Sequence, residues 1–132
     1  MHQLTKAILC PTLLLMLTAC GLSFDKRMKR EAEVFTQTHC PQIIDPVTTL
    51  DSTVYDIHTR TYIRYYSLPE HTQQAVQTNK ALLRTTLLDE LMNDASWKTC
   101  KDEGINFKYV YHISGTSTVV ATFLLTAEDY QH

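Results

Sequence analysis

Four short runs of alternating apolar and polar residues, arranged as two pairs, constrain the fold of this chain most strongly. They cover residues 48–55, 59–68, 106–113 and 119–126. The runs are rich in Thr, Val, Ile and Tyr, which favour strands. The residues between the members of each pair, 56–59 and 114–117, have the composition of turns. The pattern therefore predicts two β-hairpins.

An amphipathic segment precedes each hairpin. The first covers about residues 23–38 and repeats apolar side chains at helical spacing: Phe24, Met28, Ala32 and Phe35. The second begins near His71 and carries the row Leu83, Leu87 and Leu91. Residues 41–46, bounded by prolines, are expected to be a connector. The order helix, hairpin, helix, hairpin predicts a two-layer α+β fold: a four-stranded antiparallel sheet with two main helices on one face.

The first nineteen residues have the layout of an export signal. Lys6 is followed by an apolar run from Ala7 to Ala19 that contains Pro11. The run is about 13 residues long, whereas a membrane-spanning helix needs roughly 20. A proline also weakens such a helix, because it lacks one backbone donor. The segment is therefore interpreted as a secretory signal peptide.

The end of this run, Leu17-Thr18-Ala19-Cys20, resembles the lipobox of bacterial lipoprotein precursors. The resemblance implies that a diacylglycerol is attached to Cys20, that residues 1–19 are removed, and that the N-terminal lipid holds the protein on a membrane, facing the periplasm. No acidic residue follows the cysteine, which favours the outer membrane over the inner one. The alternative is an ordinary signal peptide cut after Ala19, with Cys20 as a free thiol.

The remaining chain is short enough to be one domain, so we expect a lipidated tether over 20–24 and a single α+β domain over 25–132. The net formal charge of the chain is −2. Nucleic-acid binding would require a basic face, which this balance does not favour. The element order and the paired cysteines are similar to small, uncharacterised bacterial lipoproteins.

Cys40 and Cys100 are the two cysteines that remain outside the signal and the lipobox. An even pair in an oxidising compartment predicts a disulfide, which would contribute about 4 kcal/mol in the chain-entropy model. The alternatives are two separate buried thiols or a metal pair. Matching histidine spacing is absent from the sequence, so no metal site and no cofactor are expected.

The sequence carries no nucleophile or phosphate-loop motif. His39 beside Cys40 is the one arrangement that would suit an activated thiolate. Most tyrosines lie in the predicted strands, where they either stabilise the sheet or present a binding surface. The candidate binding face consists of Tyr62, Tyr66, Tyr109 and Tyr111.

These features favour a lipid-anchored cell-envelope protein with a non-enzymatic binding, accessory or scaffolding role, and a partner protein in the envelope. The alternative is a small periplasmic enzyme of the hydrolase or thiol–disulfide type. A free Cys40 or Cys100 beside His39 would favour the alternative.

Overall fold

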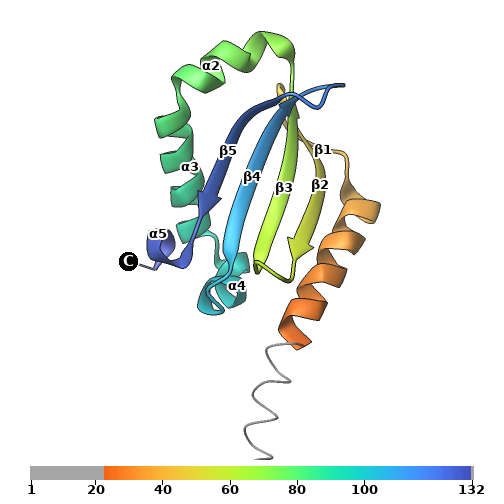
Figure 1. Ribbon diagram of the computed structural model, residues 1–132, viewed down its shortest axis with the longest axis vertical. Coiled ribbons are helices and arrows are strands. Elements are labelled where there is room, and N and C mark those ends of the chain that lie inside the picture. The colour runs from red at the N-terminus through yellow and green to blue at the C-terminus, as the bar shows by residue number, and fades with distance from the viewer. Residues whose placement is uncertain (1–22, 132) are drawn as a thin grey trace, which may run out of the picture.

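A five-stranded mixed β-sheet forms the centre of the structure, a computed structural model that describes residues 23–131 (Figure 1). The strands lie side by side in the order of the sequence. They are β1 (Gln42–Asp45), β2 (Thr48–Asp56), β3 (Thr61–Leu68), β4 (Asn106–Ile113) and β5 (Val119–Leu125). The four predicted strands therefore exist within one or two residues of their expected bounds, because alternation specifies a half-buried strand directly.

Helices connect and flank the sheet. The N-terminal helix covers residues 23–39, so residues 23 and 24 of the expected tether are already helical. The segment between β3 and β4 contains η1 (Glu70–Thr72), α2 (Gln73–Thr78), α3 (Lys80–Asn93), η2 (Ala95–Trp97) and α4 (Lys98–Asp102). The chain ends in the short α5 (Ala127–Tyr130). An α+β fold is thus confirmed.

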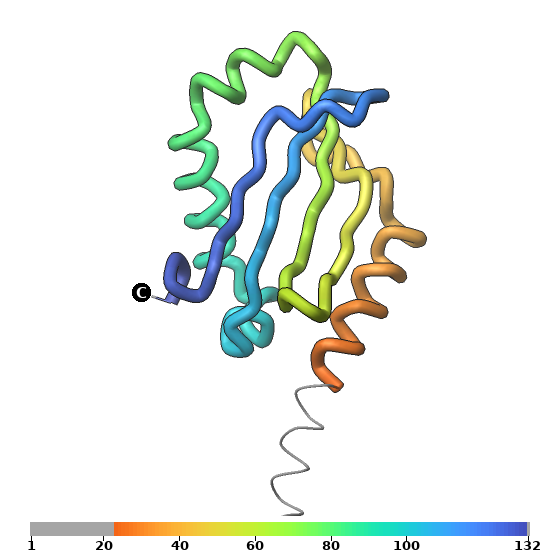
Figure 2. The backbone as a smooth tube through the Cα atoms, in the orientation of Figure 1, coloured from red at the N-terminus to blue at the C-terminus, as the bar shows by residue number. Residues whose placement is uncertain are grey.

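The predicted four-stranded antiparallel sheet is wrong in one pairing, because β3 and β4 run parallel. The helices after β3 return the chain to the end of the sheet at which β3 began, as Figure 2 traces. The eight residues of β3 extend about 26 Å and the fourteen of α3 about 21 Å. The crossover is therefore long enough to span the sheet, and a parallel pairing follows.

The predicted connector contains the fifth strand. β1 pairs antiparallel with β2 at the edge of the sheet, and all four of its residues are exposed. Prolines occur just before and just after it, at positions where no strand donor is lost. A strand whose side chains are exposed on both faces of the sheet does not alternate apolar and polar residues. The pattern that predicted the other strands was therefore absent from β1.

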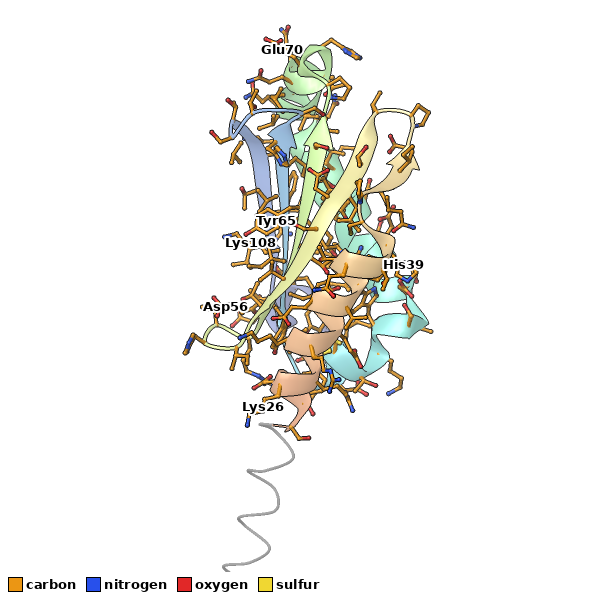
Figure 3. All side chains as sticks on the ribbon, turned by 90° about the vertical axis from the view of Figure 1, so that its right-hand side faces the viewer. Lys26, His39, Asp56, Tyr65, Glu70 and Lys108 are labelled. Atoms are coloured by element: carbon orange, nitrogen blue, oxygen red, sulfur yellow. The ribbon has the colours of Figure 1, made fainter. Side chains whose placement is uncertain are left out.

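The helices lie on one face of the sheet and leave the other face open. In Figure 3 the N-terminal helix and the crossover helices lie to one side of the sheet, whereas Tyr65 and Lys108 project from the opposite side. The open face includes Val54 and Leu124, which are 44% and 47% exposed. The two-layer arrangement predicted from the sequence is therefore present.

The N-terminal helix packs through its predicted apolar stripe. Phe24, Met28 and Ala32 are buried, and burial of each large apolar side chain stabilises the fold by about 2 kcal/mol. Polar contacts fix the helix on β2: Thr36 Oγ1 accepts a 2.8 Å hydrogen bond from the Thr53 amide and donates one of 3.0 Å to its carbonyl. These bonds satisfy the outward-facing backbone amide and carbonyl of Thr53, which lies on β2 beyond the last residue that pairs with the short β1.

Candidate binding groove

A groove on the helix-covered face of the sheet is lined by the N-terminal helix at one end and by α3 over the rest of its length. It consists of three adjoining pockets with cavity volumes of about 250, 80 and 370 Å³. The first two share Trp97, and the last two share Tyr66, Leu87 and Glu90. We call this row of pockets the interhelical groove.

The floor of the groove comes from the two parallel strands. Tyr62, Arg64 and Tyr66 occupy successive inward positions of β3, and Tyr109 and Tyr111 occupy those of β4. The register places Arg64 beside Tyr109 and Tyr66 beside Tyr111. Because the pairing is parallel and in register, the rings of Tyr66 and Tyr111 stack, with centroids 4.8 Å apart.

The walls of the groove are apolar at both of its ends. At the Tyr62 end, Met28 and Phe35 of the N-terminal helix face Trp97 and Cys100. The Tyr66 end is the larger. Its apolar lining comes from the β1–β2 hairpin, the end of β3 and the helices α2 and α3: Ile44, Val47, Leu68, Val76, Leu83 and Leu87.

Trp97 separates the Tyr62 end from the middle of the groove. Its ring meets Tyr62 edge-on at 4.9 Å and Phe107 edge-on at 5.6 Å. Asp94 fixes the preceding turn, since its Oδ1 accepts a 3.0 Å hydrogen bond from the Ser96 amide. The aromatic cluster is therefore held by both the sheet and the crossover.

The hydroxyls of Tyr62, Tyr109 and Tyr111 on the floor remain neutral at physiological pH. Burial raises the pKa of Tyr109 to about 12 and also raises the pKa values of Tyr62 and Tyr111. The groove therefore offers aromatic area and neutral hydroxyls, which are features of surfaces that hold a partner.

The predicted tyrosine face is assembled by the fold, but on the other side of the sheet from the open surface. Tyr62, Tyr66 and Tyr109 are only 6–7% exposed and belong to the core cluster. Most of their area therefore packs against protein, and only the parts that line the groove remain available. Tyr111 is half-buried.

The predicted disulfide is not formed, and both cysteines are free thiols. The sulfur of Cys100 lies 3.7 Å from that of Met28. Cys40 follows Met28 by twelve positions along the same helical segment, a rise of about 18 Å. Two Cα atoms more than about 7 Å apart cannot be bridged, so the helix itself keeps the thiols apart.

The environments of the Cys40 and Cys100 thiols do not favour nucleophilic chemistry. Burial raises the pKa of Cys100 to about 11 and, together with Asp51, raises the pKa of Cys40. A reactive cysteine requires the opposite shift. His39 is exposed, and its ring packs on Phe35 at 4.9 Å.

Two other expectations from the sequence are the lipid anchor at Cys20 and the absence of a metal site. Cys20 and the signal segment lie outside the described residues. Within residues 23–131 the structure contains no cluster of three His, Cys, Asp or Glu side chains suited to a metal ion. None of the helices in that range combines the length and the apolar character needed to cross a bilayer.

Arg64 is the groove residue that the sequence reasoning missed as a site. Its neighbours on the same strand face, Tyr62 and Tyr66, were singled out, but the cation between them was not. The available signal was a charged residue placed at an inward position of a strand, flanked by two aromatic ones.

The fold and the groove define a class: a small α+β domain with a helix-flanked five-stranded sheet and an aromatic groove on the face that the helices cover. The chain belongs to the family described as "Domain of unknown function (DUF8479)", whose model matches residues 23–121. A comparison with curated proteins finds no match.

Two solved structures share this fold. One is a protein of Pseudomonas aeruginosa described as secreted (PA3611), which is 16% identical, with 82% of this chain and 93% of that chain covered and a TM-score of 0.71. The other is the pilotin EpsS of the Vibrio vulnificus type 2 secretion system, which is 14% identical, with coverage of 83% and 94% and a TM-score of 0.64. At these identities the likeness shows the fold alone.

Proposed function

We propose that this protein is a lipid-anchored accessory protein of the bacterial cell envelope that holds a partner protein in the interhelical groove without catalysing a reaction. The observation that carries the proposal is the groove itself, a row of pockets to which the largely buried tyrosines of β3 and β4 still contribute part of their surface. Aromatic side chains bury much area at a low entropy cost, and they dominate the energetics of protein interfaces.

The anchor is the second part of the proposal and rests on the Leu17–Cys20 lipobox. Two or more acyl chains hold a protein stably on a bilayer, whereas one chain binds only marginally. Cys20 precedes the first described helical residue by three positions, a span of at most about 10 Å. The start of the N-terminal helix would then lie near the membrane, and the larger end of the groove would lie away from it.

The fold shared with a pilotin supports an accessory role in a secretion machine. We extend that role to this chain as part of the proposal, with the outer membrane favoured as the site of attachment. The raised pKa values of both described thiols weigh against the thiol–disulfide alternative.

The anchor is tested by expressing the full chain in its native host with Cys20→Ser and, as a matched control, Cys40→Ser. We expect the wild type and Cys40→Ser to incorporate labelled palmitate and to fractionate with membranes, and Cys20→Ser to do neither. Palmitate incorporation into Cys20→Ser, or a native N-terminus at Met1, would contradict the lipobox assignment.

The groove is tested by site-specific photocrosslinking in cells. A crosslinking residue at position 90 faces the groove from α3, and one at position 108 faces the open side of the sheet. We expect an envelope protein to be captured from position 90 and not from position 108. Capture of the same protein only from position 108 would move the binding surface to the open face.

A further inference from the structure

Arg64 lies in the middle of the groove floor and is held there by aromatic rings. Its guanidinium carbon is 5.0 Å from the ring centroid of Trp97 and 6.0 Å from that of Tyr62. Nη1 donates a long, 3.4 Å hydrogen bond to the hydroxyl of Tyr66. These contacts position the guanidinium but engage only one of its five N–H donors.

Within residues 23–131, Arg64 has no carboxylate oxygen within 4.0 Å of its nitrogens, in contrast to Arg27, Arg60 and Arg84. Arg60 pairs with Asp25 at 3.1 Å, and Arg84 pairs with Asp129 at 3.3 Å. A half-buried cation without an anionic partner is costly. None of the described buried donors lacks a partner, so the unused N–H groups of Arg64 remain accessible from the groove.

The carboxylates around the groove have other positions or partners. Asp94 accepts hydrogen bonds from the amide and the hydroxyl of Ser96. Glu31 lies 3.8 Å from Arg27. Glu90 lines the same pocket as Arg64 but is exposed at its rim. Asp45, in the larger end pocket, accepts hydrogen bonds from the amides of Val47 and Thr48.

Asp94 lines the same pocket as Arg64. The hydrogen bonds from Ser96 lower the pKa of Asp94, and the guanidinium of Arg64 contributes to this shift, but no direct ion pair joins Asp94 and Arg64. The guanidinium is the only basic group among the described residues that line the groove, and its direct pairing is left to a ligand carboxylate.

The position of Arg64 along the groove indicates what kind of ligand carries that carboxylate. Tyr62, Arg64 and Tyr66 follow one another at about 7 Å along β3. An apolar pocket lies at each end, so the complementary ligand is apolar on both sides of its acid. A fatty acid and a chain terminus carry their carboxylate at one end, whereas an aspartate or glutamate within a peptide carries it in the middle.

We propose that Arg64 binds the side-chain carboxylate of an aspartate or glutamate in a peptide segment of the partner. This segment lies along the groove and places one apolar side chain about 7 Å to each side of the acid. A planar guanidinium forms two parallel hydrogen bonds with a carboxylate, which gives selectivity as well as affinity. The inference rests on the proposed function and specifies the chemistry of the partner.

The probe is a random peptide library displayed on phage, selected against the full chain carrying Cys20→Ser and against the same chain with Arg64→Met. We expect the first protein to enrich peptides with an acidic residue between two apolar ones, and the second protein to lose that preference. Trp97 is the single tryptophan of the chain and lines the groove, so its fluorescence reports binding there.

An amide substitution in the most enriched peptide isolates the pairing. Changing its acid to the matching amide should weaken binding to the Arg64 protein by at least about tenfold and to Arg64→Met by less than about twofold. Lys108→Met, on the open face, is the matched control and should bind as the parent does. If Arg64→Met does not fold by circular dichroism, Arg64→Lys replaces it, with partial retention of affinity expected.

The outcomes separate the two proposals. Groove-binding peptides with no acid preference, or with the same preference on Arg64→Met, overturn the role of Arg64 and leave the proposed function standing. Displacement of the peptide by oleate in an Arg64-dependent manner assigns the carboxylate to a lipid and overturns the peptide assignment. If no selected peptide changes Trp97 fluorescence, the groove is not a peptide site and both proposals fail.

Discussion

Tyr55 donates a 2.8 Å hydrogen bond from its hydroxyl to Oδ1 of Asp25, and this bond ties β2 to the first turn of the N-terminal helix. Arg60 Nε donates to the same oxygen at 3.1 Å, while Nη2 of Arg60 reaches Glu103 at 3.2 Å. One buried carboxylate therefore joins the helix, the β2–β3 hairpin and the end of the crossover.

Tyr55→Phe removes the donor and keeps the ring, and we expect it to lower the free energy of unfolding by about 1–3 kcal/mol. Asp25→Ala should cost more, because it leaves both Tyr55 and Arg60 without their acceptor. Urea unfolding of the two variants and of Tyr55→Phe/Asp25→Ala measures the coupling. A double variant that loses the simple sum of both effects would show that the hydrogen bond does not stabilise the fold.

Leu124 and Leu125 are neighbours on β5 that point to opposite faces. Leu125 is fully buried, and Leu125→Ala should lower the free energy of unfolding by about 2–5 kcal/mol, since it removes methyl groups and leaves a cavity. Leu124 is 47% exposed, and Leu124→Ala should change stability by less than about 0.5 kcal/mol. Thermal unfolding of the pair tests the assignment of the faces, and equal losses would contradict it.

Stability should decline at alkaline pH because burial favours the neutral forms of Tyr109 and Cys100. Their pKa values rise from 10.0 to about 12 and from 9.0 to about 11. A raised folded pKa contributes stability that is fully present below the unfolded value and is lost as the pH rises through the folded value. The loss therefore begins near pH 9 for Cys100 and near pH 10 for Tyr109.

Tyr109→Phe isolates the tyrosine part of this dependence. The variant should remove a loss on the order of 1–3 kcal/mol between pH 10 and pH 12, so its unfolding free energy falls less steeply there than that of the wild type. Urea midpoints recorded across this range provide the measurement. Parallel curves for the two proteins would show that the hydroxyl is not shielded from water.

The two described thiols should react with iodoacetamide in a fixed order. Cys40 is half-buried and should be alkylated first in the native protein, whereas Cys100 is buried against Met28 and should be protected until unfolding. Peptide mass mapping after timed labelling locates the modified cysteine. Two unlabelled cysteines in the denatured, unreduced protein would instead show that the bridge predicted from the sequence forms.

The spacing of apolar residues predicted the helices and strands, which are determined by residues close to one another in the sequence. The stripe from Phe24 to Phe35 and the row from Leu83 to Leu91 became helices, and four alternating runs became strands. Each signal is local, because a helix or a half-buried strand repeats its apolar positions within a few residues.

The pairing of β3 with β4 depended on long-range geometry that a local pattern does not contain. Two hairpins can join through several pairs of strands, and only the length of the crossover distinguishes them. The same limit explains the incorrect disulfide, since compartment and even number favour pairing but do not measure the distance between Cys40 and Cys100. Arg64 was overlooked because its surroundings combine β3, β4 and the crossover, which are far apart in the sequence.

The parallel junction between β3 and β4 has a consequence for when the groove exists during synthesis. Its floor takes alternate side chains from strands that are separated in sequence by the whole helical crossover. A chain interrupted before Asn106 carries Arg64 but lacks the neighbouring tyrosines of β4. The proposed binding site is therefore incomplete until β4 has been synthesised and paired with β3.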